Sequence, residues 1–392
     1  MEKNIESNKI SLALLVCLVG FPQISETIFT PSLTEIAKGY QVSINVSQMT
    51  LSIYFLAFAF GVFFWGITSD YFGRRVAMNG GLFIYTIGCL LCYWSTDIIL
   101  LFVGRVIQAF GASTGSVTTQ TILRDNYQGK QRHTLFAQIS AALAFTPAIG
   151  PLIGGFLGQY FGYKMVFLAL VGLGTFLLIW SLKKLPETSS SKKNHLNYQK
   201  ICQIGQRMIV DKYTWTFCVL IGVLNGVLFG YHSEAPSIFI EKFGFTQAQY
   251  GFIGIVVALA TVLGSFISKQ TLERLLPETI ILLGTKIALI GSLGLLVVSL
   301  LPVSFNLLLL LYLVGIFSVL TGVGIALPNC LSLALVNFTD VAGTAGAFLS
   351  LGYYVIVSIL TFCISTIHTG SISILPVFFL GSFLLIYWMQ KR

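Results

Sequence analysis

The sequence predicts an all-α membrane protein with twelve transmembrane helices arranged in two six-helix halves. Of its 392 residues, 55% are hydrophobic and only 9% are charged, whereas soluble domains carry about 25% charged residues. Apolar stretches of roughly 20 residues, long enough to cross the ~30 Å core of a bilayer, follow one another along the chain. One longer polar segment near the middle separates six of them from the other six.

These apolar stretches are expected to be helices, because a strand or loop exposed to lipid leaves backbone polar groups unpaired. The predicted spans are residues 10–32, 46–68, 76–95, 98–121, 134–158, 163–183, 213–238, 248–268, 279–300, 305–329, 342–366 and 371–389.

The basic residues indicate how the chain is oriented. With the N-terminus in the cytoplasm, nineteen of the 23 Lys and Arg residues fall in cytoplasmic segments, and only Lys38, Lys164 and Lys242 fall outside. This asymmetry follows the positive-inside rule and predicts a multi-pass protein of the cytoplasmic (inner) cell membrane with both termini in the cytoplasm. The net charge of +9 therefore reflects membrane orientation and indicates no nucleic-acid partner.

The polar segment 184–212 is rich in Ser and Lys and is predicted to be a cytoplasmic linker. It divides the chain into an N-terminal half, 1–183, and a C-terminal half, 213–392. Transporters built from two repeated halves place their substrate site where the halves meet.

Polar residues inside the first predicted span form one stripe. Gln23, Glu26, Thr27 and Thr30 lie at offsets of 0, 3, 4 and 7, the spacing of a single helical face. Such a stripe is expected to face a water-filled cavity or a neighbouring helix, because lipid disfavours it.

The fourth span carries a second stripe that includes Arg105 and Gln108. Counting residues at 1.5 Å rise each places Arg105 and Glu26 at similar depth, roughly 20–24 Å from the inner face. We expect the two to share one central cavity and to mediate proton coupling, with Glu26 carrying the proton. The alternative is a permanent buried ion pair that only fixes packing.

Further polar and aromatic residues are candidates for the substrate cavity. Asn225 and His232 lie seven residues apart on one face of the seventh span, whereas Glu234 points away and is predicted to sit at the membrane interface. The predicted cavity set is Gln23, Thr27, Thr30, Tyr54, Gln108, Phe145, Asn225 and His232.

Two short motifs stand out beside the stripes. A charged turn follows the second span and contains Gly66, Asp70, Gly73, Arg74 and Arg75. The fifth span contains Gly150, Pro151, Gly154 and Gly155, where a helix can bend and a neighbour can approach closely.

Taken in order, these motifs resemble the major facilitator superfamily over essentially the whole chain. Within it, the chain is most similar to the twelve-helix drug:proton antiporters of the bicyclomycin-resistance (Bcr/CflA) type. The turn resembles G-x-L-A-D-R-x-G-R-R, Arg105 and Gln108 resemble R-x-x-Q-G, and Gly150 to Gly155 resemble the antiporter motif G-P-x-x-G-G. Pro328-Asn329 and Gly343-Thr344-Ala345 resemble the tenth and eleventh helices of that subgroup.

The resemblance implies roles for these residues. Asp70 would cap a helix of the second half, and an arginine of the turn would reach Asp125 at the end of the fourth helix, so that the turn acts as a gate. Tyr71 replaces the usual arginine of this motif. The subgroup's first-helix aspartate aligns with Thr27, one residue from Glu26.

The expected function is proton-coupled export of small amphipathic organic molecules by alternating access, driven by the proton gradient without a cofactor. Alternatives are a proton-coupled nutrient uptake symporter and a dedicated siderophore or metabolite exporter of the same fold. An enzyme is not expected, because the chain lacks a His-Glu-x-x-His or comparable constellation. The expected partners are the substrate, protons and lipid, and the expected state is monomeric.

Overall fold

The computed structural model describes residues 10–127, 131, 134–135, 138–139, 142–188 and 198–391, and these form an all-helical bundle. The predicted all-α fold is confirmed. Ten described helices are long and apolar enough to cross a membrane. Two shorter helices, α7 and α15 with 16 and 17 residues, lie at the two remaining predicted positions.

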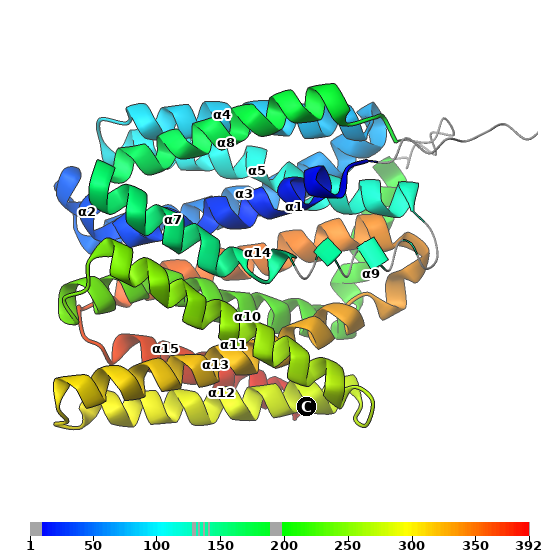
Figure 1. The fold of residues 1–392 in the computed structure, drawn as a ribbon. Helices are drawn as coiled ribbons and strands as arrows, with labels where there is room; N and C mark the ends of the chain where they lie inside the picture. Colours follow the sequence, from blue (N-terminus) through cyan, green and yellow to red (C-terminus); the bar gives the residue numbers. More distant parts are fainter. Residues whose placement is uncertain are drawn as a thin grey trace, which may run out of the picture.

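The first part of the chain supplies the upper layers of Figure 1. Its predicted fifth span, 134–158, lies partly outside the described residues, and helix α7 begins at Thr146. The elements are α1 (Leu12–Thr27), η1 (Thr30–Ser32), α2 (Leu33–Gly39), α3 (Ile44–Phe72), α4 (Arg74–Trp94), α5 (Ile98–Asn126), α7 (Thr146–Phe161) and α8 (Tyr163–Lys184).

The second part forms the lower layers. It contains α9 (Tyr198–Val210), α10 (Lys212–Pro236), η2 (Ser237–Lys242), α11 (Gln247–Thr271), α12 (Pro277–Leu300), α13 (Phe305–Leu333), η3 (Val336–Val341), α14 (Ala342–Ile367) and α15 (Ile374–Gln390). Helix α9 lies within the predicted linker, so that segment is not wholly irregular. The exact boundaries of the two halves stay a prediction.

Local signals explain where several helices begin. Asp97 accepts a hydrogen bond from the Leu100 backbone N–H at 2.9 Å and caps α5. Thr246 and Gln249 form a reciprocal capping box at the start of α11. Gly73 adopts φ of 102° between α3 and α4, a conformation that side chains disfavour.

Side-chain packing forms two hydrophobic clusters, one built mainly from residues 10–185 and the other from residues 204–386. Helix α3 packs along α14, and α7 packs along α11, so these two pairs join the clusters. Phe55 of α3 also contacts Phe229 of α10, with their ring centroids 4.3 Å apart.

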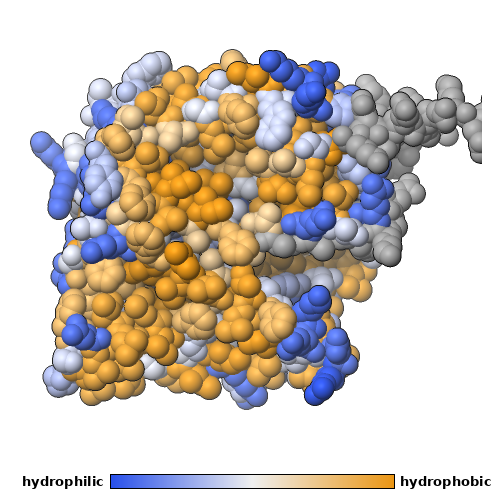
Figure 2. Space-filling view, viewed as in Figure 1, coloured by the Kyte–Doolittle hydropathy of each residue, from blue (hydrophilic) through white to orange (hydrophobic). Residues whose placement is uncertain are grey.

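The long helices run side by side, so the bundle has two ends (Figure 1). We call the end that holds the α3–α4 turn and the start of α10 the linker end, and the opposite end, where α3 begins and α14 stops, the far end. Figure 2 shows apolar side chains over the middle of one face and hydrophilic ones gathered toward both ends. This is the surface of a chain that spans a bilayer.

Candidate functional site

A cavity of about 360 Å³ lies between the two clusters, in the middle of the bundle. Polar side chains from α1 and α10 face it from opposite sides, and Phe229 and Tyr354 supply aromatic surface. Five polar residues that were predicted from the sequence as site residues line this cavity: Gln23, Glu26, Thr27, Asn225 and His232. A cavity that receives residues from both parts of the chain fits a substrate site at a repeat interface.

Glu26 is the acid of this cavity and is only 2% exposed. Within the described residues no ion pair joins it to Arg105. The charge of Arg105 is close enough to act on Glu26, but no salt bridge in the described part of the chain neutralises the carboxyl group. An intramembrane carboxyl group in such a place is costly to keep ionised, so it is a functional-site candidate. Nearby, Thr146 donates a short hydrogen bond to the Gln23 side chain, which holds the α1 stripe against the start of α7.

Arg105 is fully buried and does not line the cavity. Its Nη1 donates to Gln108 Oε1 at 2.6 Å. Its guanidinium carbon lies 3.9 Å from the ring centroid of Phe29 and 4.2 Å from that of Tyr54. The cation is therefore held between two ring faces, an attraction that strengthens when water is excluded.

The structure places four of the predicted cavity residues elsewhere. Tyr54 and Gln108 hold Arg105, and the Thr30 hydroxyl donates to the Thr27 carbonyl at 2.8 Å. Phe145 is 56% exposed and does not line the cavity. The span that holds each of them was predicted from the sequence, but the direction of each side chain depends on how the helices rotate against one another.

A second cavity, of about 510 Å³, lies between the first one and the linker end. The two cavities share the lining residues Leu143 and Tyr354, and the second also includes the exposed side chains of Gln120 and Arg124. Together they lead from Glu26 toward the linker end.

The charged turn lies at the linker end. Arg74 donates through Nε to Asp125 Oδ2 at 2.8 Å, the contact that the resemblance implied. Arg74 also pairs with Asp70 at 2.9 Å, and that carboxylate is about half exposed. The implied cap on a helix of the second half is absent from the described contacts of Asp70, so the turn is tied within the first half. Among the other residues of the turn, Arg75 donates to the Leu182 carbonyl and Gly66 lies beside Val117 and Ala347.

The glycines of α7 let three helices approach closely. A methyl group on Gly150 would overlap Thr27, one on Gly154 would overlap the Ile28 carbonyl, and one on Gly155 would overlap the Gln247 carbonyl. The Pro151 carbonyl in turn lies against Gly251 of α11. The motif thus joins α1, α7 and α11 beside the cavity.

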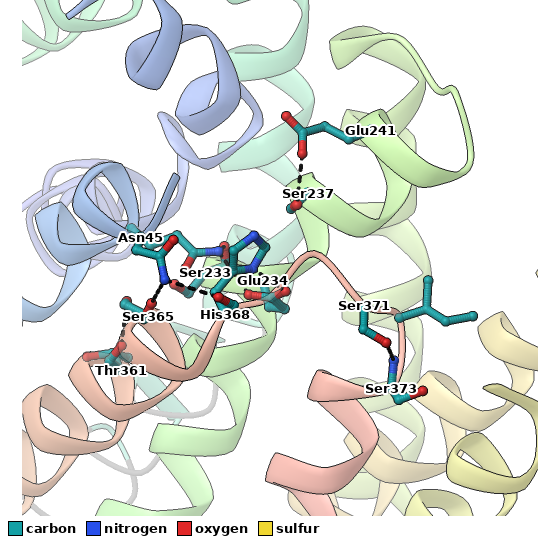
Figure 3. Close-up of polar contacts among 12 residues, drawn as sticks. Asn45, Ser233, Glu234, Ser237, Glu241, Thr361, Ser365, His368, Ser371 and Ser373 are labelled. Carbon is teal, nitrogen blue, oxygen red and sulfur yellow. Dashed lines mark hydrogen bonds and ion pairs between the residues drawn. The ribbon is translucent and has the colours of Figure 1, made fainter. Parts of the chain in front are cut away.

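A polar cluster at the far end was not anticipated (Figure 3). Glu234 lies in the last turn of α10 and is fully buried within the protein; its place at the membrane interface stays a prediction. Its Oε1 lies 2.7 Å from His368 Nδ1, and its Oε2 accepts from Gln48 Nε2 at 2.9 Å. Asn45 donates to the carbonyls of Ser365 and His368 at 2.8 and 3.2 Å. These residues come from α3, α10 and the end of α14, so no local sequence pattern links them.

The described residues contain no group of three or more His, Cys, Asp or Glu side chains that could hold a metal ion. The central cavity, its buried acid Glu26 and the far-end cluster, in a bundle of apolar helices, together fit a polytopic membrane transport protein.

Comparison with known proteins gives the family. Residues 15–361 match the model of the Major Facilitator Superfamily. An uncharacterised transporter of Rickettsia felis is 32% identical over 93% of this chain and 91% of its own length. A bicyclomycin resistance protein homologue of Haemophilus influenzae is 24% identical over 76% of each chain. The solved structure of a nucleoside transporter, NupG, has a TM-score of 0.78 at 13% identity, covering 97% of this chain and 99% of its own.

The chain therefore belongs to the major facilitator superfamily. It is a secondary transporter and not an enzyme, and members of this family use ion gradients without a cofactor.

Proposed function

We propose that this transporter is a proton-coupled exporter of small amphipathic organic molecules, of the bicyclomycin-resistance type. The observation that carries the proposal is Glu26, a buried carboxyl group that lines the central cavity and forms no ion pair with any residue that the structure describes. A proton neutralises this group, and a bound substrate competes for the same space. The Gly150-Pro151 motif and the name of the Haemophilus influenzae relative favour export of a drug-like substrate.

The arrangement of ends supports an inward-facing state. With the predicted topology, the linker end and both termini face the cytoplasm, and the two cavities lead from Glu26 toward that side. The far end is closed by the Gln48 and Asn45 contacts. Rocking of the two halves about the cavity would open the far end and close the linker end.

Coupling requires that the proton and the substrate bind the two states with different affinities. Proton binding to Glu26 from the outside removes a buried charge and disfavours a substrate that is held by that charge. Arg105 takes part indirectly in this proposal, because its contacts with the rings of Phe29 and Tyr54 join α5 to the segment after α1 and to α3.

Everted membrane vesicles with an imposed pH gradient test the proposal. Wild-type protein is expected to accumulate substrate from a panel of amphipathic drugs when the interior is acidified. Glu26→Gln is expected to abolish gradient-driven accumulation, because its side chain no longer binds and releases a proton. The matched control is Glu278→Gln, which replaces an exposed acid in the first turn of α12 and is expected to retain gradient-driven accumulation.

Two outcomes would contradict the proposal. Gradient-driven transport that survives Glu26→Gln would remove Glu26 as the proton carrier. Substrate movement together with the protons, in place of exchange against them, would identify an uptake symporter.

A further inference from the structure

The far-end cluster contains a second buried acid that the proposed mechanism does not use. Glu234 is 0% exposed, and the His368 side chain is only 8% exposed. An ionised carboxylate at such a site requires a cation or several hydrogen-bond donors, because desolvation of an unpaired charge is very costly. One of its oxygens accepts from Gln48 Nε2, and the other lies 2.7 Å from His368 Nδ1, which donates when the imidazole carries a proton on that nitrogen.

The hydrogen bonds indicate that Glu234 acts as an acceptor. Gln48 Nε2 lies 2.9 Å from Glu234 Oε2 and 3.1 Å from the Ser233 carbonyl. Both partners are acceptors, so the amide nitrogen uses its two N–H groups on α10. With Glu234 ionised, a protonated His368 gives a buried pair of zero net charge, whereas a neutral His368 leaves one negative charge buried.

The cluster is divided between elements that separate when a transporter of this fold opens. Gln48 and Asn45 belong to α3, whereas Glu234 ends α10 and His368 follows α14. Opening the far end therefore breaks the Gln48 and Asn45 contacts but leaves Glu234 and His368 together. Water then reaches the pair, and the penalty for an unbalanced charge falls.

We propose that Glu234 and His368 form a second proton-binding site, separate from Glu26, whose protonation closes the far end of the transporter. A ligand shifts a conformational equilibrium toward the state that it favours. The proton favours the closed far end, because the closed state alone excludes water from the pair. We call the Asn45, Gln48, Glu234 and His368 contacts the far-end lock.

Other titratable and charged side chains lie near the far-end lock, but the Glu234–His368 pair is its proton-binding centre. Tyr312 of α13 lies close enough to feel the Glu234 charge, and its hydroxyl donates to the Ile372 carbonyl at 2.8 Å. Glu241 accepts a hydrogen bond from Ser237, and Lys242 lies near Gly370 beyond His368. His232 lines the central cavity instead. Asn45 and Gln48, from α3, are neutral.

This inference rests on the proposed function for its direction. In an exporter driven by inward protons, a proton arriving from outside must promote the return to the inward-facing state. Protonation of the Glu234–His368 pair closes the far end and so supplies that step. The proton bound there is additional to the one that Glu26 carries.

Ser52 provides a reporter for the lock. It lies on α3 beneath the lock, is 3% exposed, and its carbonyl accepts from the Ser358 hydroxyl of α14 at 2.8 Å. Its own hydroxyl makes no hydrogen bond within the described part of the chain, so Ser52→Cys is a conservative change. Intact cells are treated with a membrane-impermeant maleimide, and the labelling of Ser52→Cys reports how often the far end opens. The labelling of the chain that has only its native cysteines is subtracted. Thr96→Cys, at an exposed far-end position, normalises for thiol reactivity.

We expect normalised Ser52→Cys labelling to fall about tenfold between about pH 8 and about pH 6. His368→Gln and Glu234→Gln remove this pH response, whereas the matched control Glu241→Gln keeps it. Gln48→Ala raises labelling at both pH values, because the lock loses its α3 donor.

A pH response that survives His368→Gln or Glu234→Gln would overturn the proposal, as would Ser52→Cys labelling that is independent of pH. Folding of each variant is checked by its elution as a single peak in detergent. An error in the predicted membrane orientation would be detected separately, because Thr96→Cys would then not be labelled from outside the cell. Loss of proton-coupled export is likewise measured independently, in vesicles.

Discussion

At the scale of single residues, Arg105 shows how a membrane interior accommodates a permanent cation. Among the residues that the structure describes, none hydrogen-bonds to its Nε or Nη2 atom, yet its planar group lies against the rings of Phe29 and Tyr54. The attraction between the cation and the two ring faces offsets the free-energy cost of the missing hydrogen bonds. Only a planar delocalised cation fits between two ring faces in this way.

Arg105→Lys is therefore expected to destabilise the protein despite keeping the charge. A lysine loses the stacking and the 2.6 Å contact with Gln108, at a cost of about 2 kcal/mol for a desolvated site. Thermal unfolding in detergent measures the loss. The control is Arg124→Lys, an exposed position in the last turn of the same helix, which should leave the unfolding temperature unchanged. Equal effects at both positions would show that the rings contribute nothing specific.

At the scale of elements, the α7 glycines decide how closely α1, α7 and α11 pack. The Ile28 carbonyl occupies the space where a side chain on Gly154 would begin. Because that obstacle is backbone, it cannot turn aside as a flexible side chain would. The close approach places Thr27 and Gln23 against α7 and thereby sets the width of the cavity.

Gly154→Ala is accordingly expected to separate α7 from the segment after α1 and to cost about 1–3 kcal/mol of stability. Gly172→Ala on α8 is the matched control, since no atom lies within 4 Å of its added methyl group and alanine is the better helix former. Unfolding temperatures and substrate affinity measure both variants. Wild-type behaviour of Gly154→Ala would contradict the close approach.

At the scale of the whole molecule, the proposed mechanism requires that the far end open while the linker end closes. The described contacts hold the far end shut through α3, α10 and α14. At the linker end, by contrast, Arg74 ties the turn to Asp125 within the first half. In the proposed mechanism, this arrangement is the state in which the far end is closed.

A reversible cross-link tests this whole-molecule motion. Oxidising the double variant Ser52→Cys/Ser358→Cys joins α3 to α14 at the far end, and transport is expected to stop because the halves no longer separate there. Adding a reductant should restore it. Each single variant, treated with the same oxidant, serves as control. Continued transport by fully cross-linked protein would show that this interface does not open during the cycle.

The sequence by itself determined the properties that depend on neighbours along the chain. Hydrophobic length predicted the spans, and helical periodicity predicted that Gln23, Glu26 and Thr27 share a face that reaches a cavity. Both signals are local, because they arise from helix geometry and from transfer to lipid.

Only the tertiary structure decided which distant side chains meet. It placed Arg105 between aromatic rings apart from Glu26, turned Phe145 away from the cavity, and joined Glu234 to Gln48 and His368. Residues 48 and 234, or 234 and 368, belong to helices whose rotation and crossing are set by packing over the whole bundle. A change of one residue in register turns a side chain by ~100°, so local spacing cannot fix such contacts.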